Sequence, residues 1–200
     1  MTAGTGKRGI VLIHGSGSRG ICVWLKELPW LAAAGYHVLA YDQGCVGGSS
    51  CPQPTDPLLE ARIVTAHLKR LGAERVTVVA ASAGGPYALH LAADPDRGIT
   101  AAVALSPAGL DKPLAGVDQT ADAAAARLQV PLLMAASPDD SSVDSATLQR
   151  LKGAGGSKMT IDALPAGAGH AQEILYAPGS SAPSDFRKRL LAFLNRRSGS

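Results

Sequence analysis

Aromatic side chains are scarce in this chain, at 4% of its 200 residues, although hydrophobic residues make up 46%. A folded core therefore has to be built mostly from Ala, Val and Leu. No apolar run approaches the roughly 18 residues that a membrane-spanning helix requires. The first residues of the chain also lack the apolar stretch of a signal peptide. We therefore expect a cytoplasmic protein without a membrane partner.

The chain has only 3 cysteines, too few for a disulfide scaffold. Cys45 and Cys51 are close enough in sequence to bridge across a loop, but we expect thiols of a cytoplasmic protein to stay reduced. No C-x-x-C or H-E-x-x-H pattern occurs, and Asp139, Asp140 and Asp144 lack the spacing of a calcium loop. The sequence therefore predicts no metal ion and no cofactor.

A strong charge imbalance is also missing, since the formal net charge is +3 and the basic residues are scattered. The densest basic groups, at positions 187–189 and 196–197, fall in an expected amphipathic helix at the end of the chain. There they are typical of a solvated helix face rather than of a nucleic-acid patch. We therefore expect no nucleic-acid partner, and the oligomeric state stays open.

Short apolar runs alternate with amphipathic stretches along the chain. The length suits one domain, spanning 1–200. The expected strands are nearly continuous apolar runs, which indicates that both faces of their sheet are covered. Alternation with helices predicts right-handed crossovers and parallel strands. The predicted fold is α/β, a doubly wound, mostly parallel sheet of about six strands with helices on both faces. The strands are expected at 9–14, 36–41, 75–81, 100–105, 131–136 and 157–163, and the helices at 23–34, 57–71, 84–93, 118–128, 145–152 and 184–196.

The turn around Ser82 is the strongest functional signal. It follows the third expected strand and precedes a helix, and the neighbours at −2 and +2 are the small Ala80 and Gly84. This is the setting of a nucleophile elbow, in which a sharp turn lifts a serine hydroxyl above the edge of a sheet. The usual pattern is G-x-S-x-G, so the first glycine is replaced by alanine here. The sequence therefore predicts that Ser82 is a nucleophile.

Two further reactive residue types follow other strands. Ligands of such sheets bind beyond the carboxyl ends of the strands. Asp139 and Asp140 follow the fifth expected strand, and His170 follows the sixth. A serine hydroxyl needs a base to take its proton, and a carboxylate orients that base and stabilises it when charged. We predict His170 as the base and favour Asp140 as the acid, with Asp139 as a solvated neighbour.

The order Ser, Asp, His along one sheet edge resembles the α/β-hydrolase family of serine hydrolases. The resemblance extends over nearly the whole chain and rests on short pieces in the family's order: His14-Gly15, Gly35-Tyr36 leading to Asp42, the elbow at 80–84, Leu105-Ser106-Pro107, Pro131-Leu132-Leu133 before Asp140, and Gly169-His170. The resemblance implies a structural role for His14. It also implies an oxyanion hole formed by the backbone N–H groups of Ser16 and Ala83.

The chain departs from the family pattern in three places. Gly44 and Cys45 stand where the pattern D-x-R-G-x-G-x-S has Arg and Gly. The two first strands of the full fold are expected to be missing. Only 24 residues separate Ser106 from Pro131, where the family often inserts a lid. We therefore expect a single domain without a cap and with an open site.

A competing interpretation concerns Gly15, Gly17 and Gly20. They form a G-x-G-x-x-G pattern after a strand, and Asp42 ends the next strand about twenty residues further on. These features are typical of an NAD(P)-dependent oxidoreductase. His14 before the first glycine and a helix expected to begin only near Val23 argue against it. That interpretation also leaves the serine, acid and histidine unexplained.

The residues together favour a serine hydrolase that cleaves small carboxylic esters or thioesters through an acyl-enzyme at Ser82. Its partner would be a small-molecule ester. An acyltransferase or a non-catalytic binding protein on the same fold stays as the alternative, since a fold does not fix a function.

Overall fold

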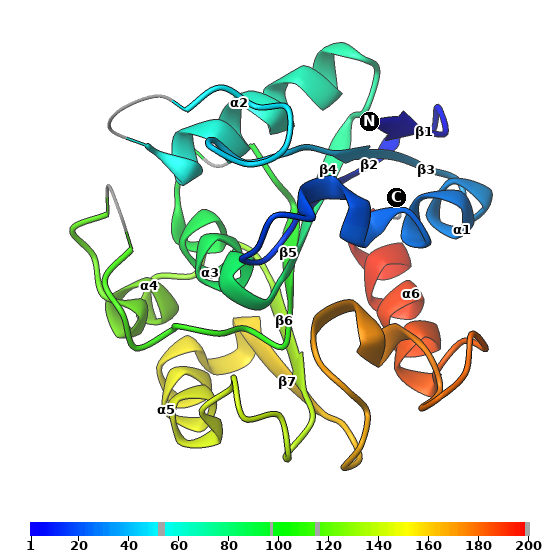
Figure 1. Ribbon diagram of the computed structural model, residues 1–200. Helices are drawn as coiled ribbons and strands as arrows, with labels where there is room; N and C mark the ends of the chain where they lie inside the picture. Colours follow the sequence, from blue (N-terminus) through cyan, green and yellow to red (C-terminus); the bar gives the residue numbers. More distant parts are fainter. Residues whose placement is uncertain (52–54, 97, 115–116, 199–200) are drawn as a thin grey trace.

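Seven strands form one sheet in the computed structural model, which describes residues 1–51, 55–96, 98–114 and 117–198 (Figure 1). The order across the sheet is β1-β3-β2-β4-β5-β6-β7, and all neighbours except β1 and β3 run parallel. The strands are β1 (Thr2–Ala3), β2 (Arg8–Ile13), β3 (Tyr36–Ala40), β4 (Arg75–Ala81), β5 (Ala101–Leu105), β6 (Leu132–Ala136) and β7 (Met159–Ala163). The central strands are buried almost throughout, as expected for a sheet with both faces covered.

Helices cover the two faces in separate layers (Figure 1). One hydrophobic cluster joins the sheet to α2 (Pro57–Arg70), α3 (Gly85–Ala93), α4 (Ala121–Ala126) and α5 (Ser145–Gly155). A second cluster joins the opposite face to α1 (Glu27–Ala33) and α6 (Asp185–Ser198). Short 3-10 turns complete the structure: η1 (Gly20–Trp24), η2 (Ser82–Gly84), η3 (Gly156–Lys158) and η4 (Ala171–Leu175). The doubly wound α/β fold predicted from the sequence is therefore confirmed.

The structure corrects some expected elements. A first strand, β1, pairs antiparallel with β3 at the edge of the sheet, so the sheet has one strand more than expected. The helix expected at 23–34 is divided into η1 and α1, because Pro29 has no N–H and is tolerated only in the first turn of a helix. Helix α5 continues to Gly155, through glycines at which the sequence predicted an end.

The connection between β5 and β6 was expected to lack a lid. Its described residues, 106–114 and 117–131, contain the short helix α4 and no other helix or strand. Two short pieces of the chain lie outside the described residues. One is at 115–116 in this connection, and the other is at 52–54, in the loop after β3 that differs from the family pattern. Within the described ranges, none of the helices combines the length and apolarity needed to span a membrane.

Candidate active site

Ser82 lies at the sharp turn between β4 and α3. Its φ of +50° is in the left-handed region, which a non-glycine residue adopts only at a cost in strain. The turn needs its small neighbours: a Cβ added at Gly84 would lie 2.8 Å from the carbonyl oxygen of His14, and one at Gly85 would lie 2.4 Å from Cβ of Pro107. The backbone around Ser82 therefore has the geometry of a nucleophile elbow.

The side chains of Ser82, His170 and Asp140 form a continuous hydrogen-bonded row. Nε2 of His170 lies 2.9 Å from Oγ of Ser82, and Nδ1 lies 2.7 Å from Oδ2 of Asp140. The Asp140 side chain is 3% exposed and that of His170 is 36% exposed, so the acid is buried beneath a histidine that solvent reaches. A carboxylate only accepts, so Nδ1 carries the proton and Nε2 is left to accept from the serine hydroxyl.

Asp140 is fixed by its own turn. Its second carboxylate oxygen accepts a hydrogen bond from the backbone N–H of Ser142 at 3.0 Å, and its own N–H donates to the carbonyl oxygen of Ser137. Both carboxylate oxygens are thus engaged, which holds the acid in one orientation toward His170. Of the two adjacent acids, Asp140 is the one in contact with the imidazole.

Asp139 is exposed, as expected, but it is more than a solvated neighbour. Its carboxylate accepts from the Ser137 hydroxyl and from the N–H of Gly167, at 2.9 and 3.1 Å to the two oxygens. The Ser137 hydroxyl and then the Gly167 N–H hold the pKa of Asp139 below its usual value. Gly167 belongs to the loop that carries His170, so Asp139 ties that loop to the end of β6.

Glu173 is a second support of His170 that the sequence analysis missed. Its Oε2 accepts a hydrogen bond from the backbone N–H of His170 at 3.1 Å. Gly169, directly before the histidine, has a φ of +91°, and a Cβ there would lie 2.9 Å from Glu173. The glycine is therefore required by both backbone conformation and space. The pattern G-H-x-x-E, in which a glutamate follows at the start of a turn, is the signal that would have revealed this contact.

Ser16 and Ala83 line one cavity beside the nucleophile. Neither N–H takes part in a turn or loop hydrogen bond within the described parts of the chain. Gly15 lets the loop approach, since a Cβ at this position would lie 2.8 Å from Cβ of Ser82. His14 is 2% exposed, and its Nε2 accepts from the N–H of Gln43 at 3.1 Å. The histidine thus supports the neighbouring loops and does not join the row.

Asp42 connects the loop after β2 with the loop after β3. Its two carboxylate oxygens accept from the N–H groups of Ile21, at 2.8 Å, and Gly48, at 3.2 Å. A Cβ at Gly20 would lie 2.0 Å from this carboxylate. The glycine-rich loop is thus packed on Asp42. The 3-10 turn η1, which follows this loop, begins at Gly20, whereas a helix was expected to begin only near Val23. In the dinucleotide interpretation Asp42 would instead face a ribose.

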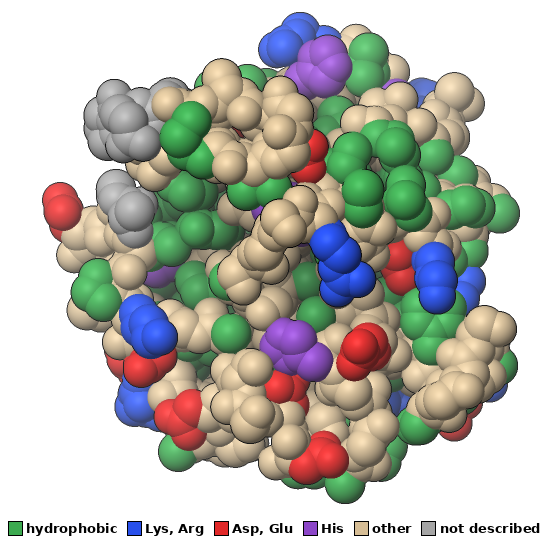
Figure 2. Space-filling view, viewed as in Figure 1, with side chains coloured by type: hydrophobic (Ala, Val, Ile, Leu, Met, Phe, Trp, Pro, Cys, Tyr) green, Lys and Arg blue, Asp and Glu red, His purple; other side chains and the backbone are tan. Residues whose placement is uncertain are grey.

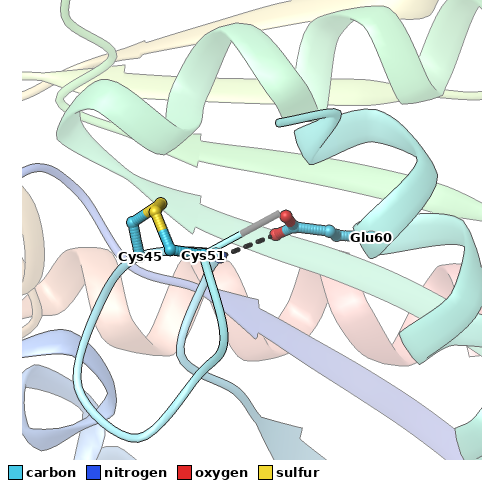
Figure 3. The surroundings of a disulfide bond; sticks show 4 residues. Cys45, Cys51 and Glu60 are labelled. Carbon is cyan, nitrogen blue, oxygen red and sulfur yellow. Dashed lines mark hydrogen bonds between the residues drawn. A yellow bond between two sulfur atoms is a disulfide. The ribbon is translucent and has the colours of Figure 1, made fainter. Parts of the chain in front are cut away.

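Cys45 and Cys51 form a disulfide, so the expectation that these thiols stay reduced was wrong. The bridge closes the loop after β3, and Figure 3 shows it beside Glu60 of α2. The two cysteines are brought together because the loop folds back through hydrogen bonds between Cys45 N–H and the Ser50 carbonyl oxygen and between the Ser49 hydroxyl and the Asp42 carbonyl oxygen. Cys22 is free and exposed.

The surface around the site carries side chains of both charges. Lys and Arg are scattered among Asp and Glu on the face in Figure 2, with histidine near its centre. Within the described ranges, no group of three or more His, Cys, Asp or Glu side chains is arranged to hold a metal ion.

A parallel sheet with a serine elbow after β4, an acid after β6 and a histidine after β7 defines an α/β-hydrolase arrangement. The chain belongs to the alpha/beta hydrolase family, whose model matches residues 10–194. No curated protein sequence is significantly similar to it.

Several solved structures are similar in fold. An esterase of Pyrococcus furiosus has a TM-score of 0.76 and 20% identity, covering 97% of this chain and 84% of its own. A monoacylglycerol lipase of Paleococcus ferrophilus has a TM-score of 0.76 and 19% identity, covering 99% of this chain and 98% of its own. A proline iminopeptidase of Mycobacterium smegmatis has a TM-score of 0.72 and 14% identity, covering 98% and 92%. At these identities the likeness establishes the shared fold.

Proposed function

We propose that the protein is a serine hydrolase that cleaves small carboxylic esters or thioesters through an acyl-enzyme at Ser82. The observation that carries the proposal is the hydrogen-bonded row from Ser82 Oγ through His170 to Asp140. An isolated serine hydroxyl is a weak nucleophile, and a base at 2.9 Å is within reach of its proton. The esterase and lipase among the structural neighbours agree with this class of reaction.

The first half of the reaction transfers the acyl group to the enzyme. Ser82 Oγ forms a bond to the carbonyl carbon of the ester while His170 Nε2 takes the hydroxyl proton. Asp140 stabilises the resulting imidazolium without taking its proton. The N–H groups of Ser16 and Ala83 would bind the developing oxyanion, and a single such donor is typically worth about 2.7–4 kcal/mol in the transition state. The bond to the leaving oxygen or sulfur then breaks, and the leaving group takes the proton from His170.

The second half releases the acid. Water gives a proton to His170 Nε2 and attacks the acyl carbon, and the proton returns to Ser82 Oγ as the carboxylic acid leaves. An alcohol or amine in place of water would make the same chemistry an acyl transfer. Apart from water, the only partner that this chemistry requires is the small-molecule ester, and it calls for neither a nucleic acid nor a membrane.

The short connection between β5 and β6 supports a single domain, 1–200, with an open site and without a cap. Interfacial activation usually depends on a mobile lid. We therefore expect short acyl chains to be favoured, because a CH₂ group left in water forgoes roughly 0.8 kcal/mol of binding. The cytoplasmic location remains a prediction from the sequence alone. The disulfide between Cys45 and Cys51 is more typical of a protein in an oxidising compartment.

A panel of p-nitrophenyl esters of increasing acyl length tests the proposal. We expect turnover to peak at roughly C2 to C6, where the acyl chain is short enough to be covered. The rate should rise smoothly past the solubility limit of the ester. A preference for C12 or a jump at that limit would contradict the open site, and an absence of turnover on every ester would contradict the hydrolase. Saturable binding of NADH, measured as quenching of the fluorescence of Trp24 and Trp30, would favour the oxidoreductase.

A further inference from the structure

A cavity of about 260 Å³ adjoins the oxyanion loop and contains one acidic side chain. It is bounded by residues 14–17, the loop after β3, the start of α2, Ala83 and Tyr87. A water molecule takes up roughly 30 Å³ in the liquid, so the cavity has room for a short substituent of a few heavy atoms. The acidic side chain is Glu60, in the first turn of α2.

The geometry of the reaction determines which part of a substrate enters this cavity. The leaving group has to face Nε2 of His170, because that atom returns the proton. The lining of the cavity includes Ser16 and Ala83 and no described residue of the loop that carries His170. The cavity thus lies on the oxyanion side of Ser82, away from the leaving group. It is therefore positioned to take the acyl part of the substrate.

Among the residues that the structure describes, no positive charge balances Glu60 in this cavity. None of the lining residues is Lys or Arg, and in the described part of the chain no ion pair includes Glu60. His14 also lines the cavity, but its Nε2 accepts a backbone N–H, so the imidazole is neutral. The Glu60 carboxylate is half-buried.

The phenols near Glu60 do not change the charge of this region. Burial and, to a smaller extent, the Glu60 carboxylate raise the pKa of Tyr87 and of Tyr41. Both phenols therefore stay neutral near pH 7. One hydrogen bond to Glu60 is present in the described structure, from the N–H of Gly44 to Oε2 at 3.0 Å, which Figure 3 shows at the base of the disulfide loop. This leaves most of the carboxylate's capacity to accept hydrogen bonds available to a ligand.

We propose that Glu60 binds a protonated amino group on the acyl part of the substrate, so that the enzyme prefers esters of short amino acids over esters of plain aliphatic acids. This inference rests on the proposed ester hydrolysis at Ser82. A carboxylate in a partly dry cavity is costly when unpaired, and an ammonium group at hydrogen-bond distance offsets that cost. Glu60 would act on binding and orientation, while the chemical steps stay with Ser82, His170 and Asp140.

Two esters of the same size isolate the charge. In ethyl 3-aminopropanoate an ammonium group replaces the terminal methyl group of ethyl butanoate. We would measure kcat/KM for both at pH 7 by pH-stat titration, in wild type, Glu60→Gln and Glu74→Gln. The last variant removes an equal charge from Glu74, an exposed residue paired with Lys7, and serves as the matched control.

We expect wild type and Glu74→Gln to prefer the amino ester by about tenfold, the size of a close charge pair in a partly solvated site. Glu60→Gln should lower this ratio about tenfold. The amide still accepts from Gly44, and any loss of loop order affects both esters, so the ratio reports the charge alone. A purely structural Glu60 would leave the ratio unchanged, and that result would overturn the inference.

Wild type alone provides a second measurement, which does not depend on the folding of a variant. Raising the salt concentration from about 0.05 to 0.5 M should reduce the preference, since screening weakens charge pairs that solvent reaches. A wild-type preference for ethyl butanoate would overturn the inference while leaving ester hydrolysis intact. An absence of turnover on both esters would overturn the proposed function and this inference together.

Discussion

Substituting Gly15 by alanine tests the close approach between the oxyanion loop and the nucleophile. The backbone of Gly15 is not in the left-handed region, so space alone makes glycine necessary here. The added methyl group would lie 2.8 Å from Cβ of Ser82, 3.1 Å from the carbonyl oxygen of Ala81 and 3.4 Å from Oγ of Ser82.

The expected magnitude follows from these distances. Two carbon atoms in contact need about 3.5–4.0 Å, so the loop has to recede from Ser82 by roughly 1 Å. Such a shift moves the Ser16 N–H away from the oxyanion, and loss of one donor costs roughly 10²–10³ in kcat. Overpacking of this kind also costs about 1–3 kcal/mol of stability, or roughly 2–4 °C in Tm for each kcal/mol in a chain of this length.

The assay is hydrolysis of p-nitrophenyl butanoate, with thermal unfolding measured on the same samples. Gly48→Ala is the matched control, because a Cβ at Gly48 meets no atom within 4 Å and its backbone is ordinary. We expect Gly15→Ala to lose about 100-fold in kcat/KM and Gly48→Ala to stay close to wild type. Retention of a third or more of the activity by a folded Gly15→Ala protein would refute the role of this approach.

Three further predictions concern other parts of the structure. Asp140→Asn should reduce kcat by roughly 10⁴, as removal of the orienting charge does in other triads. Asp139→Ala should reduce kcat only about tenfold, by loosening the loop before His170. Equal losses in the two variants would contradict the assignment of Asp140 as the acid. Burial raises the pKa of the Glu27 carboxyl above 4.5, so its contribution to stability is present below that pH and is lost as the pH rises through the folded pKa. Glu27→Gln should therefore raise Tm more at pH 8 than at pH 4 in calorimetry, and an equal gain at both pH values would contradict this. Replacing Cys45 and Cys51 by serine should lower the free energy of unfolding by about 2 kcal/mol in the chain-entropy model. The double variant should also have a higher KM, because the loop that the disulfide closes lines the cavity. An unchanged urea midpoint together with an unchanged KM would contradict this prediction.

The sequence was sufficient to locate the strands that carry the candidate site, because parallel strands bring their carboxyl ends to one edge. Ser82 directly follows β4, and Asp140 and His170 lie in the loops after β6 and β7, so the order of strands was enough to expect them together. The two-residue strand β1 has too few residues for a period and was missed. The contact between Asp139 and Gly167 depends on how two loops meet across 28 residues of sequence, and no local pattern encodes such a contact.

The most direct test of the central claim is covalent labelling of Ser82 by a fluorophosphonate, followed by intact mass and peptide mapping. The elbow and the contact with His170 predict one adduct, on the peptide that contains Ser82. Ser82→Ala should remove both the adduct and ester turnover, since loss of a nucleophile of this kind costs on the order of 10⁶ in rate. Ser141→Ala, at an exposed serine in the same region, is the matched control and should keep both. An adduct or ester turnover that persists in Ser82→Ala would contradict the account.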